Sequence, residues 1–247
     1  MRTLALLACV VFAGPVLAQP LARRVEAAPD GAVRLSYPAH EGVCGKGGNY
    51  WSRDRGDDNW TGAGCEAGPV RVQLETQGGA VVRLRSYVGG NWLPRSGVTD
   101  LGDVDAGEAQ SLLLDLAKTA SPRVAADALT PAVLAAAPDP WQRLLELSRD
   151  PSRAEDVRKQ SIFWLGQSAA REATAGLAAI AEGDPATELQ KTAVFALSQG
   201  RDPARVDELM KVAKAHRNPE VVKSALFWLA QSEDPRAVGL FEEILTR

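Results

Sequence analysis

The chain is poor in the residues that carry metal and redox chemistry, with three cysteines and two histidines in 247 residues. The sequence also contains no HExxH, no phosphate-binding loop and no dinucleotide fingerprint. Neither His40 nor His216 has a nucleophile beside it in a recognisable catalytic motif. These absences predict a protein that is not an enzyme and that holds no metal ion or cofactor.

A strong charge of one sign and long apolar runs are missing as well. Lys and Arg number 28 against 31 Asp and Glu, which gives a formal net charge of −3. This balance excludes the basic footprint of a nucleic-acid-binding protein and a polybasic membrane anchor. After residue 18 no run approaches the roughly 20 apolar residues of a membrane span, so we expect no membrane-spanning helix.

The first 18 residues have the pattern of an export signal. Arg2 gives a positive start, an apolar run follows at 4–12, and small residues at 16–18 end in Ala18. We therefore expect a signal peptide over 1–18, a mature chain that begins at Gln19, and a periplasmic or extracellular protein. The alternative is a lipoprotein anchored through Cys9, but that cysteine lies inside the apolar run.

A short pattern occurs three times without gaps at an interval of 32 residues, at 157–167, 189–199 and 221–231. Its apolar and small residues recur at spacings of three and four, which places them on one face of a helix. A second apolar helix follows each copy. A fixed period of this length indicates stacked helical hairpins that bury their apolar faces against their neighbours. The shared face consists of Val157, Ser161, Ile162, Leu165, Leu189, Ala193, Val194, Leu197, Val221, Ala225, Leu226 and Leu229.

These units resemble HEAT repeats, specifically the short variety first noticed in phycobilisome lyases. The resemblance covers three units over 151–247 and implies an α-solenoid, with irregular leading helices over 105–150. Repeat proteins of this kind usually present surfaces to other proteins. The lyase activity of some proteins with similar repeats would rest on analogy of fold alone.

The segment 31–92 has a different pattern, in which apolar and polar residues alternate over 69–75 and 80–88 around Gly78-Gly79. This alternation predicts a β-hairpin, and 32–37 is a third candidate strand. We expect a small antiparallel β domain with linkers at 19–30 and 93–104. The fold class is therefore α+β.

Cys44 and Cys65 remain when the signal peptide is removed. In an oxidising compartment we expect them to form a disulfide around a Gly- and Asp-rich loop over 42–64, worth roughly 3 kcal/mol in the chain-entropy model. The order of Cys44, Cys65 and the 87–92 segment resembles the front of a group of exported bacterial HEAT-repeat proteins. That resemblance supports the layout of 31–247 and implies no activity.

Three residue types recur one unit apart and form candidate partner-binding columns on the first helices. The i, i+4, i+8 spacing places each trio on one helical face. They either grip an extended acidic partner or maintain the stack, with phenylalanine packed between units. Trp164 and Trp228, two units apart, either fill the core or act as exposed aromatic anchors at an interface. The columns are Lys159, Phe163 and Gln167, then Lys191, Phe195 and Gln199, then Lys223, Phe227 and Gln231.

The loop around residues 50–60 is the other candidate site. Tyr50, Trp51 and Trp60 could stack on a glycan, which predicts a carbohydrate- or peptidoglycan-binding function as the alternative. The same aromatic residues could instead fold over the small sheet. Oxygen ligands for calcium are also present, although their spacing matches no EF-hand loop. Those candidate ligands are Asp54, Asp57, Asp58 and Asn59.

Taken together, the patterns predict a non-enzymatic scaffold or adaptor of the cell envelope. It would bind an unidentified partner protein through the surface of its helical repeats.

Overall fold

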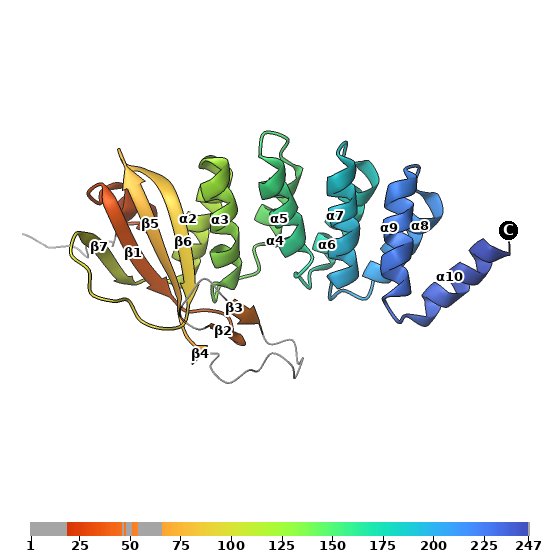
Figure 1. Cartoon of the computed structure of the whole chain (residues 1–247), viewed down its shortest axis with the longest axis horizontal. Coiled ribbons are helices and arrows are strands. Elements are labelled where there is room, and N and C mark those ends of the chain that lie inside the picture. Colours follow the sequence, from red (N-terminus) through yellow and green to blue (C-terminus); the bar gives the residue numbers. More distant parts are fainter. Residues whose placement is uncertain (1–18, 46, 48–50, 54–65, 247) are drawn as a thin grey trace, which may run out of the picture.

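A computed structural model describes residues 19–45, 47, 51–53 and 66–246. The fold is α+β, with a small sheet at one end and a row of helices that runs away from it (Figure 1). The predicted signal peptide over 1–18 lies outside the described residues.

Four strands form the larger sheet, in the order β6-β5-β1-β7. Strands β5 (Val70–Gln77) and β6 (Ala80–Val88) make the predicted antiparallel hairpin, and β1 (Gly31–Tyr37) is antiparallel to β5. Strand β7 (Val98–Asp103) pairs with β1 in parallel. The expectation of a purely antiparallel domain is therefore wrong, and the sheet is mixed because part of the expected linker supplies its edge strand.

The hairpin turn explains why the sequence predicts this part of the sheet well. Gly78 and Gly79 have φ of 59° and 74°. Two-residue hairpin turns favour positive φ because their twist then matches that of the strands, and glycine adopts it without strain.

Two further elements lie in segments that were expected to be irregular. Helix α1 (Leu21–Glu26) falls in the expected 19–30 linker and buries Leu21 and Val25, which are four residues apart. A second, three-stranded sheet forms within and just after the expected 42–64 loop. Its strands are β2 (Val43–Gly45), β3 (Trp51–Arg53) and β4 (Glu66–Ala67).

One face of the larger sheet packs on the first helices. Val33, Leu35, Val70 and Val72 point to this side and are at most 1% exposed. They alternate with more polar residues because successive strand side chains point to opposite faces. Figure 1 shows helices α2 and α3 next to the sheet, so the sheet and the helical row share one core.

The helices contact one another mainly in pairs, α2 with α3, α4 with α5, α6 with α7 and α8 with α9, and α7 packs between α5 and α9. Helices α9 and α10 each begin with a side-chain cap, because Asn218 and Asp234 accept hydrogen bonds from their first-turn amides. The helices are α2 (Ala106–Thr119), α3 (Pro122–Leu134), α4 (Trp141–Arg149), α5 (Glu155–Leu165), α6 (Arg171–Gly183), α7 (Thr187–Gln199), α8 (Arg205–Ala215), α9 (Pro219–Ala230) and α10 (Pro235–Leu245).

The repeated face of the first helices is buried as its period predicts. The small position is filled by Ser161, Ala193 and Ala225, each 0% exposed. A side chain of this size allows neighbouring helices to approach closely. The Ser161 hydroxyl is satisfied locally, because it donates to the carbonyl of Val157 at 2.8 Å.

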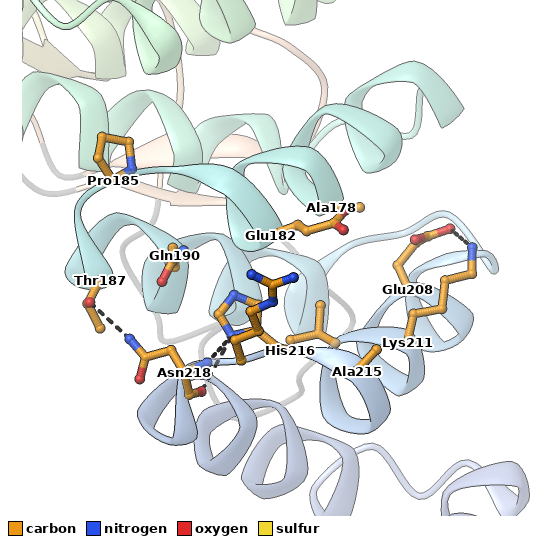
Figure 2. A pocket seen from close by; sticks show the side chains of 12 residues that line it. Ala178, Glu182, Pro185, Thr187, Gln190, Glu208, Lys211, Ala215, His216 and Asn218 are labelled. Carbon is orange, nitrogen blue, oxygen red and sulfur yellow. Dashed lines mark hydrogen bonds and ion pairs between the residues drawn. The ribbon is translucent and has the colours of Figure 1, made fainter.

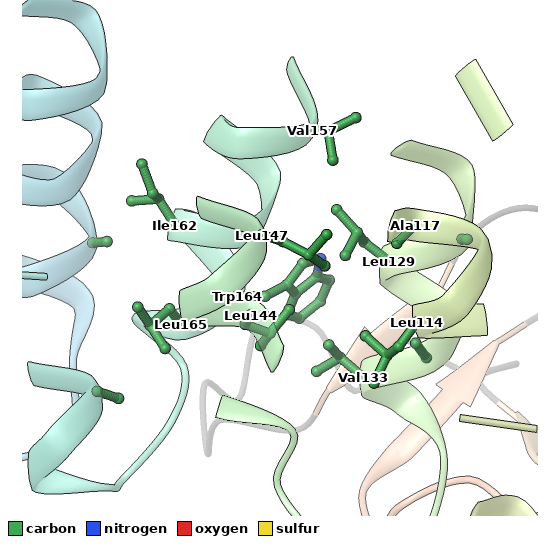
Figure 3. Close-up of a cluster of buried hydrophobic side chains, with 14 of the residues drawn as sticks. Leu114, Ala117, Leu129, Val133, Leu144, Leu147, Val157, Ile162, Trp164 and Leu165 are labelled. Carbon is green, nitrogen blue, oxygen red and sulfur yellow. The ribbon is translucent and has the colours of Figure 1, made fainter. Parts of the chain in front are cut away.

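Trp164 belongs to this core. Its side chain is buried and lies beside Leu144 and Leu147 of α4 and Val133 of α3 (Figure 3). The core interpretation of Trp164 therefore holds, and the ring joins the leading helices to the first repeat unit.

Candidate functional site

The lysine column does not present three equivalent free charges. Lys159 Nζ lies 2.6 Å from a carboxylate oxygen of Glu155, and Lys191 Nζ lies 3.0 Å from one of Glu188. The hydrogen bond to Glu155 raises the pKa of Lys159 above its ordinary value. Lys223 is exposed and forms no ion pair within the described part of the chain. The first two lysines are therefore engaged on their own helices, and the third is available to a partner.

The phenylalanine in the last helix pair is also the most exposed of its column. Phe163 and Phe195 are half-buried, and Phe195 contacts Trp228 of the next unit with ring centroids 5.0 Å apart. Phe227 also contacts Trp228, at 5.0 Å, but it is 56% exposed. The first two phenylalanines thus help to pack the helices, as the stacking interpretation predicts. Phe227 leaves most of its ring in solvent.

The glutamine in the last helix pair is likewise the most exposed of its column. Gln167 and Gln199 are half-buried, and Gln199 Nε2 donates to the Ser198 hydroxyl at 3.2 Å. Gln231 is exposed at the C-terminal end of α9. The structure therefore brings lysine, phenylalanine and glutamine together as an exposed trio in the last unit. We call Lys223, Phe227 and Gln231 the terminal face.

The terminal face contains an apolar side chain that is largely exposed. The described residues contain four exposed large apolar side chains, and two of them, Phe227 and Val238 at 56% and 58%, lie in the last helix pair. In the unit before, the ring of Phe195 is covered by Trp228.

A groove of about 810 Å³ lies between α6 and α8, near their C-terminal ends. Figure 2 shows Gln190 of α7 and His216 of the α8–α9 loop among the side chains that line it. Asn218 fixes the loop, because its side-chain Nδ2 donates to the Thr187 hydroxyl at 3.1 Å and its backbone N–H donates to His216 Nδ1 at 3.0 Å. The sequence patterns did not single out this groove.

Two charged side chains on the wall of the groove neutralise each other. Lys211 Nζ lies 2.7 Å from a carboxylate oxygen of Glu208, and this contact raises the pKa of Lys211. Glu182 and Arg217 also line the groove, and neither forms an ion pair within the described part of the chain. The groove thus carries both signs of charge.

The outer face of the larger sheet has a compact cation–π cluster. The guanidinium carbons of Arg34 and Arg71 lie 4.7 and 4.8 Å from the centroid of the Trp92 ring. Both arginines are buried, at 7% and 5% exposed, and burial is the main cause that lowers the pKa of Arg71. Arg71 also donates to the carbonyls of Gly47 and Gly89. These contacts hold the segment after β6 against the sheet, which is a structural role.

Several predicted site residues lie outside the described residues. Tyr50, Trp60 and Cys65 are among them, together with the candidate calcium ligands at 54 and 57–59. Trp51 lies on β3, where it pairs with Gly45. The Cys44–Cys65 disulfide and the glycan site therefore stay predictions.

None of the helices in the described residues combines the length and the apolarity needed to cross a membrane. Among the same residues, no three His, Cys, Asp or Glu side chains are grouped so that they could hold a metal ion.

Comparison with models of known protein families and with curated proteins finds no match to the chain.

Proposed function

We propose that this chain is a non-enzymatic scaffold or adaptor of the cell envelope that binds a partner protein through its helical region. In this proposal the row of helices is an α-solenoid of HEAT-like units, and the predicted signal peptide exports the chain. The contact site is the terminal face.

One observation carries the proposal: Phe227 is 56% exposed while its counterpart one unit earlier is packed against Trp228. An exposed aromatic side chain bordered by polar groups is a typical anchor of a protein-binding surface. Lys223 and Gln231 supply those polar groups. Aromatic anchors of this kind usually contribute much of the binding energy of an interface.

The test is photo-crosslinking of the full chain in the native envelope, with a photo-reactive amino acid in place of Lys223. We expect a crosslink to a protein that disappears in Phe227→Ala. The matched control is Val82→Ser, because Val82 is 50% exposed but lies on β6, in the sheet. A crosslink that survives Phe227→Ala, or that is lost equally in both variants, would argue against the terminal face as the contact site.

A separate binding assay tests the alternative function. Retention of the chain on purified peptidoglycan, lost in the double variant Trp51→Ala with Trp60→Ala, would favour carbohydrate binding. In that case we expect no protein crosslink from position 223.

A further inference from the structure

Strand β6 lies at one edge of the larger sheet, and part of its main chain is left without a partner. Among the strands of that sheet it pairs with β5 alone. The carbonyl of Val88 marks the free side of β6, because it accepts from the backbone N–H of Gly47 at 2.9 Å. In an antiparallel strand, alternate residues direct their N–H and C=O groups to the same side. Leu84 and Ser86 therefore direct theirs to the free side as well.

Within the described residues, this open edge extends over residues 83–87. At one end it stops at Val88, whose carbonyl is already bonded. At the other end the register shifts, and Val82 has no partner residue in β5. Between these two points no backbone hydrogen bond joins Leu84 or Ser86 to a segment beyond the sheet. Unpaired main-chain groups in a row are a template for another extended chain.

The side chains along this edge are of two kinds. Leu84 is 3% exposed and belongs to the core that the sheet shares with the helices. Arg83 and Arg85 point to the opposite, outer face, because successive strand side chains alternate, and both are exposed. Strand β6 contains no acidic residue. The edge is therefore basic on its outer side, although the chain as a whole has a formal charge of −3.

The two arginines differ in what compensates their charge. Arg83 Nη1 lies 3.9 Å from a carboxylate oxygen of Glu75, and its charge also favours the ionised form of Asp127 on α3. Arg85 forms no ion pair within the described part of the chain, and its neighbour across the strand pair is the neutral Gln73. Arg85 is thus the cation that stays available to a partner.

Other residues of the outer face add positive charge. Arg71 on β5 and Arg34 on β1 stack on Trp92, and neither forms an ion pair with a residue that the structure describes. The acidic Asp100 lies on β7, at the opposite edge of the sheet. Because opposite charges attract across an interface, the β6 edge favours a negatively charged segment.

A second copy of the chain fits this edge poorly. Two β6 strands that pair around a two-fold axis form one continuous sheet with a common outer face. Arg83 and Arg85 of both copies would then gather on that face. Like charges that face each other across a strand pair are destabilising, and charged edges oppose self-pairing for this reason. The charges therefore favour an acidic segment of another protein.

The place of Arg85 on the edge determines which side-chain pattern fits. An antiparallel strand would exchange main-chain hydrogen bonds with Leu84 and Ser86. Arg85, between them, would face its counterpart in a non-hydrogen-bonded pair, in which side chains lie closest. A carboxylate at that position meets the guanidinium. The residues before and after it point to the inner face beside Leu84, where apolar side chains fit.

We infer that the open edge of β6 at residues 83–87 binds an extended segment of a partner protein as a fifth, antiparallel strand. That segment alternates acidic and apolar residues and places a carboxylate opposite Arg85. The inference goes beyond the proposed function, whose contact site lies on α9.

The probe is a seven-residue peptide with blocked ends, which has glutamate as its second, fourth and sixth residues and valine elsewhere. Its binding to the full chain is followed by NMR of the backbone amides. We expect the amide signals of Leu84 and Ser86 to shift and their hydrogen exchange to slow at least about 10-fold. The matched peptide has lysine in place of each glutamate and should bind at least about 10-fold more weakly. Equal binding of the two peptides would overturn the inference.

A charge reversal in the protein tests the role of Arg85. Arg85→Glu should weaken binding of the glutamate peptide at least about 10-fold and should bind the lysine peptide instead. The matched control is Val82→Ser, which leaves both arginines and the open main chain in place and should bind as the unchanged chain does. Binding of the glutamate peptide that is undiminished in Arg85→Glu would contradict the proposed pairing.

Methylation of peptide nitrogens separates strand addition from charge attraction alone, and it leaves the protein unchanged. Methyl groups on the third and fifth residues, both valines, remove N–H groups that donate to β6, so binding should weaken about 10-fold. A methyl group on the fourth residue, a glutamate, lies on the outer side of the added strand and should have no effect. Any other pattern would overturn the inference. So would light scattering that shows the free chain to be a dimer that Arg85→Glu strengthens or dissociates.

The two proposals fail independently. The glutamate peptide should also bind Phe227→Ala, because the terminal face lies on α9. A crosslink from position 223 in a chain that does not bind the peptide would leave the proposed function standing and refute only the β6 edge.

Discussion

Trp164 is the side chain whose removal tests most directly whether the helices share one core. It is 4% exposed and lies beside side chains of α3 and α4 (Figure 3). A buried indole removes about 150–250 Å² from water, which corresponds to roughly 4–6 kcal/mol at ~25 cal/mol/Å². Alanine keeps part of that area buried, so we expect Trp164→Ala to lower the free energy of unfolding by about 3–5 kcal/mol.

The assay is urea unfolding of the full chain followed by far-ultraviolet circular dichroism. Phe227→Ala is the reference, because a ring that is 56% exposed should cost only about 0.5 kcal/mol or less when it is removed. The denaturant dependence of the unfolding free energy should be the same in both variants. A loss below about 1 kcal/mol in Trp164→Ala would refute the assignment of this ring to a shared core.

Three further perturbations test other parts of the structure. Trp92→Leu removes the ring on which two buried guanidiniums stack, and each stacking contact is worth about 1–2 kcal/mol. We therefore expect the free energy of unfolding in urea to fall by roughly 2–4 kcal/mol. An unchanged unfolding midpoint would contradict the cation–π cluster. Gly166→Ala would place its Cβ 2.7 Å from the backbone oxygen of Ala196. We therefore expect the free energy of unfolding to fall by about 1–3 kcal/mol and calorimetry to give a lower Tm. An equal Tm would show that the backbone moves to accommodate the methyl group. Hydrogen bonds from Arg236 lower the pKa of Asp234 to about 2 from the ordinary 3.8. Because the pKa is depressed in the folded state, this carboxylate stabilises the fold above about pH 4 and ceases to do so as the pH falls through about 2. The stability difference between the unchanged chain and Asp234→Asn should therefore shrink over that range, and a difference that does not vary with pH would contradict the pairing.

The burial of the first-helix face could be predicted because its causes are local. The spacing of Val157, Ser161 and Leu165 determines which residues share a helical face. The interval of 32 then brings equivalent faces together in successive units. All three side chains are buried in the structure.

The parts of the sheet that the sequence did not predict depend on distant pairing. Strand β7 includes Asp100 and Gly102, which are uncommon in strands, and it forms because β1 offers it a free edge. Helix α1 is six residues long, which is too short for a helical period to be recognised. It is held by burial of Leu21 and Val25 against the shared core. Such contacts are decided by tertiary structure and leave little trace in a local pattern.

The same reasoning explains which candidate site residues the sequence could and could not identify. Identity between units does not by itself distinguish packing from exposure, because the ring of Phe195 packs against Trp228 while that of Phe227 is 56% exposed. The exposure of Phe227 depends on which side chains pack around it, and a comparison of residue types does not reveal this. The groove arises where the repeat changes, at Gln190 and His216 in place of an arginine and an aspartate. Where a 32-residue pattern governs the packing of the helices, sites for other molecules are therefore best sought at the positions that depart from that pattern.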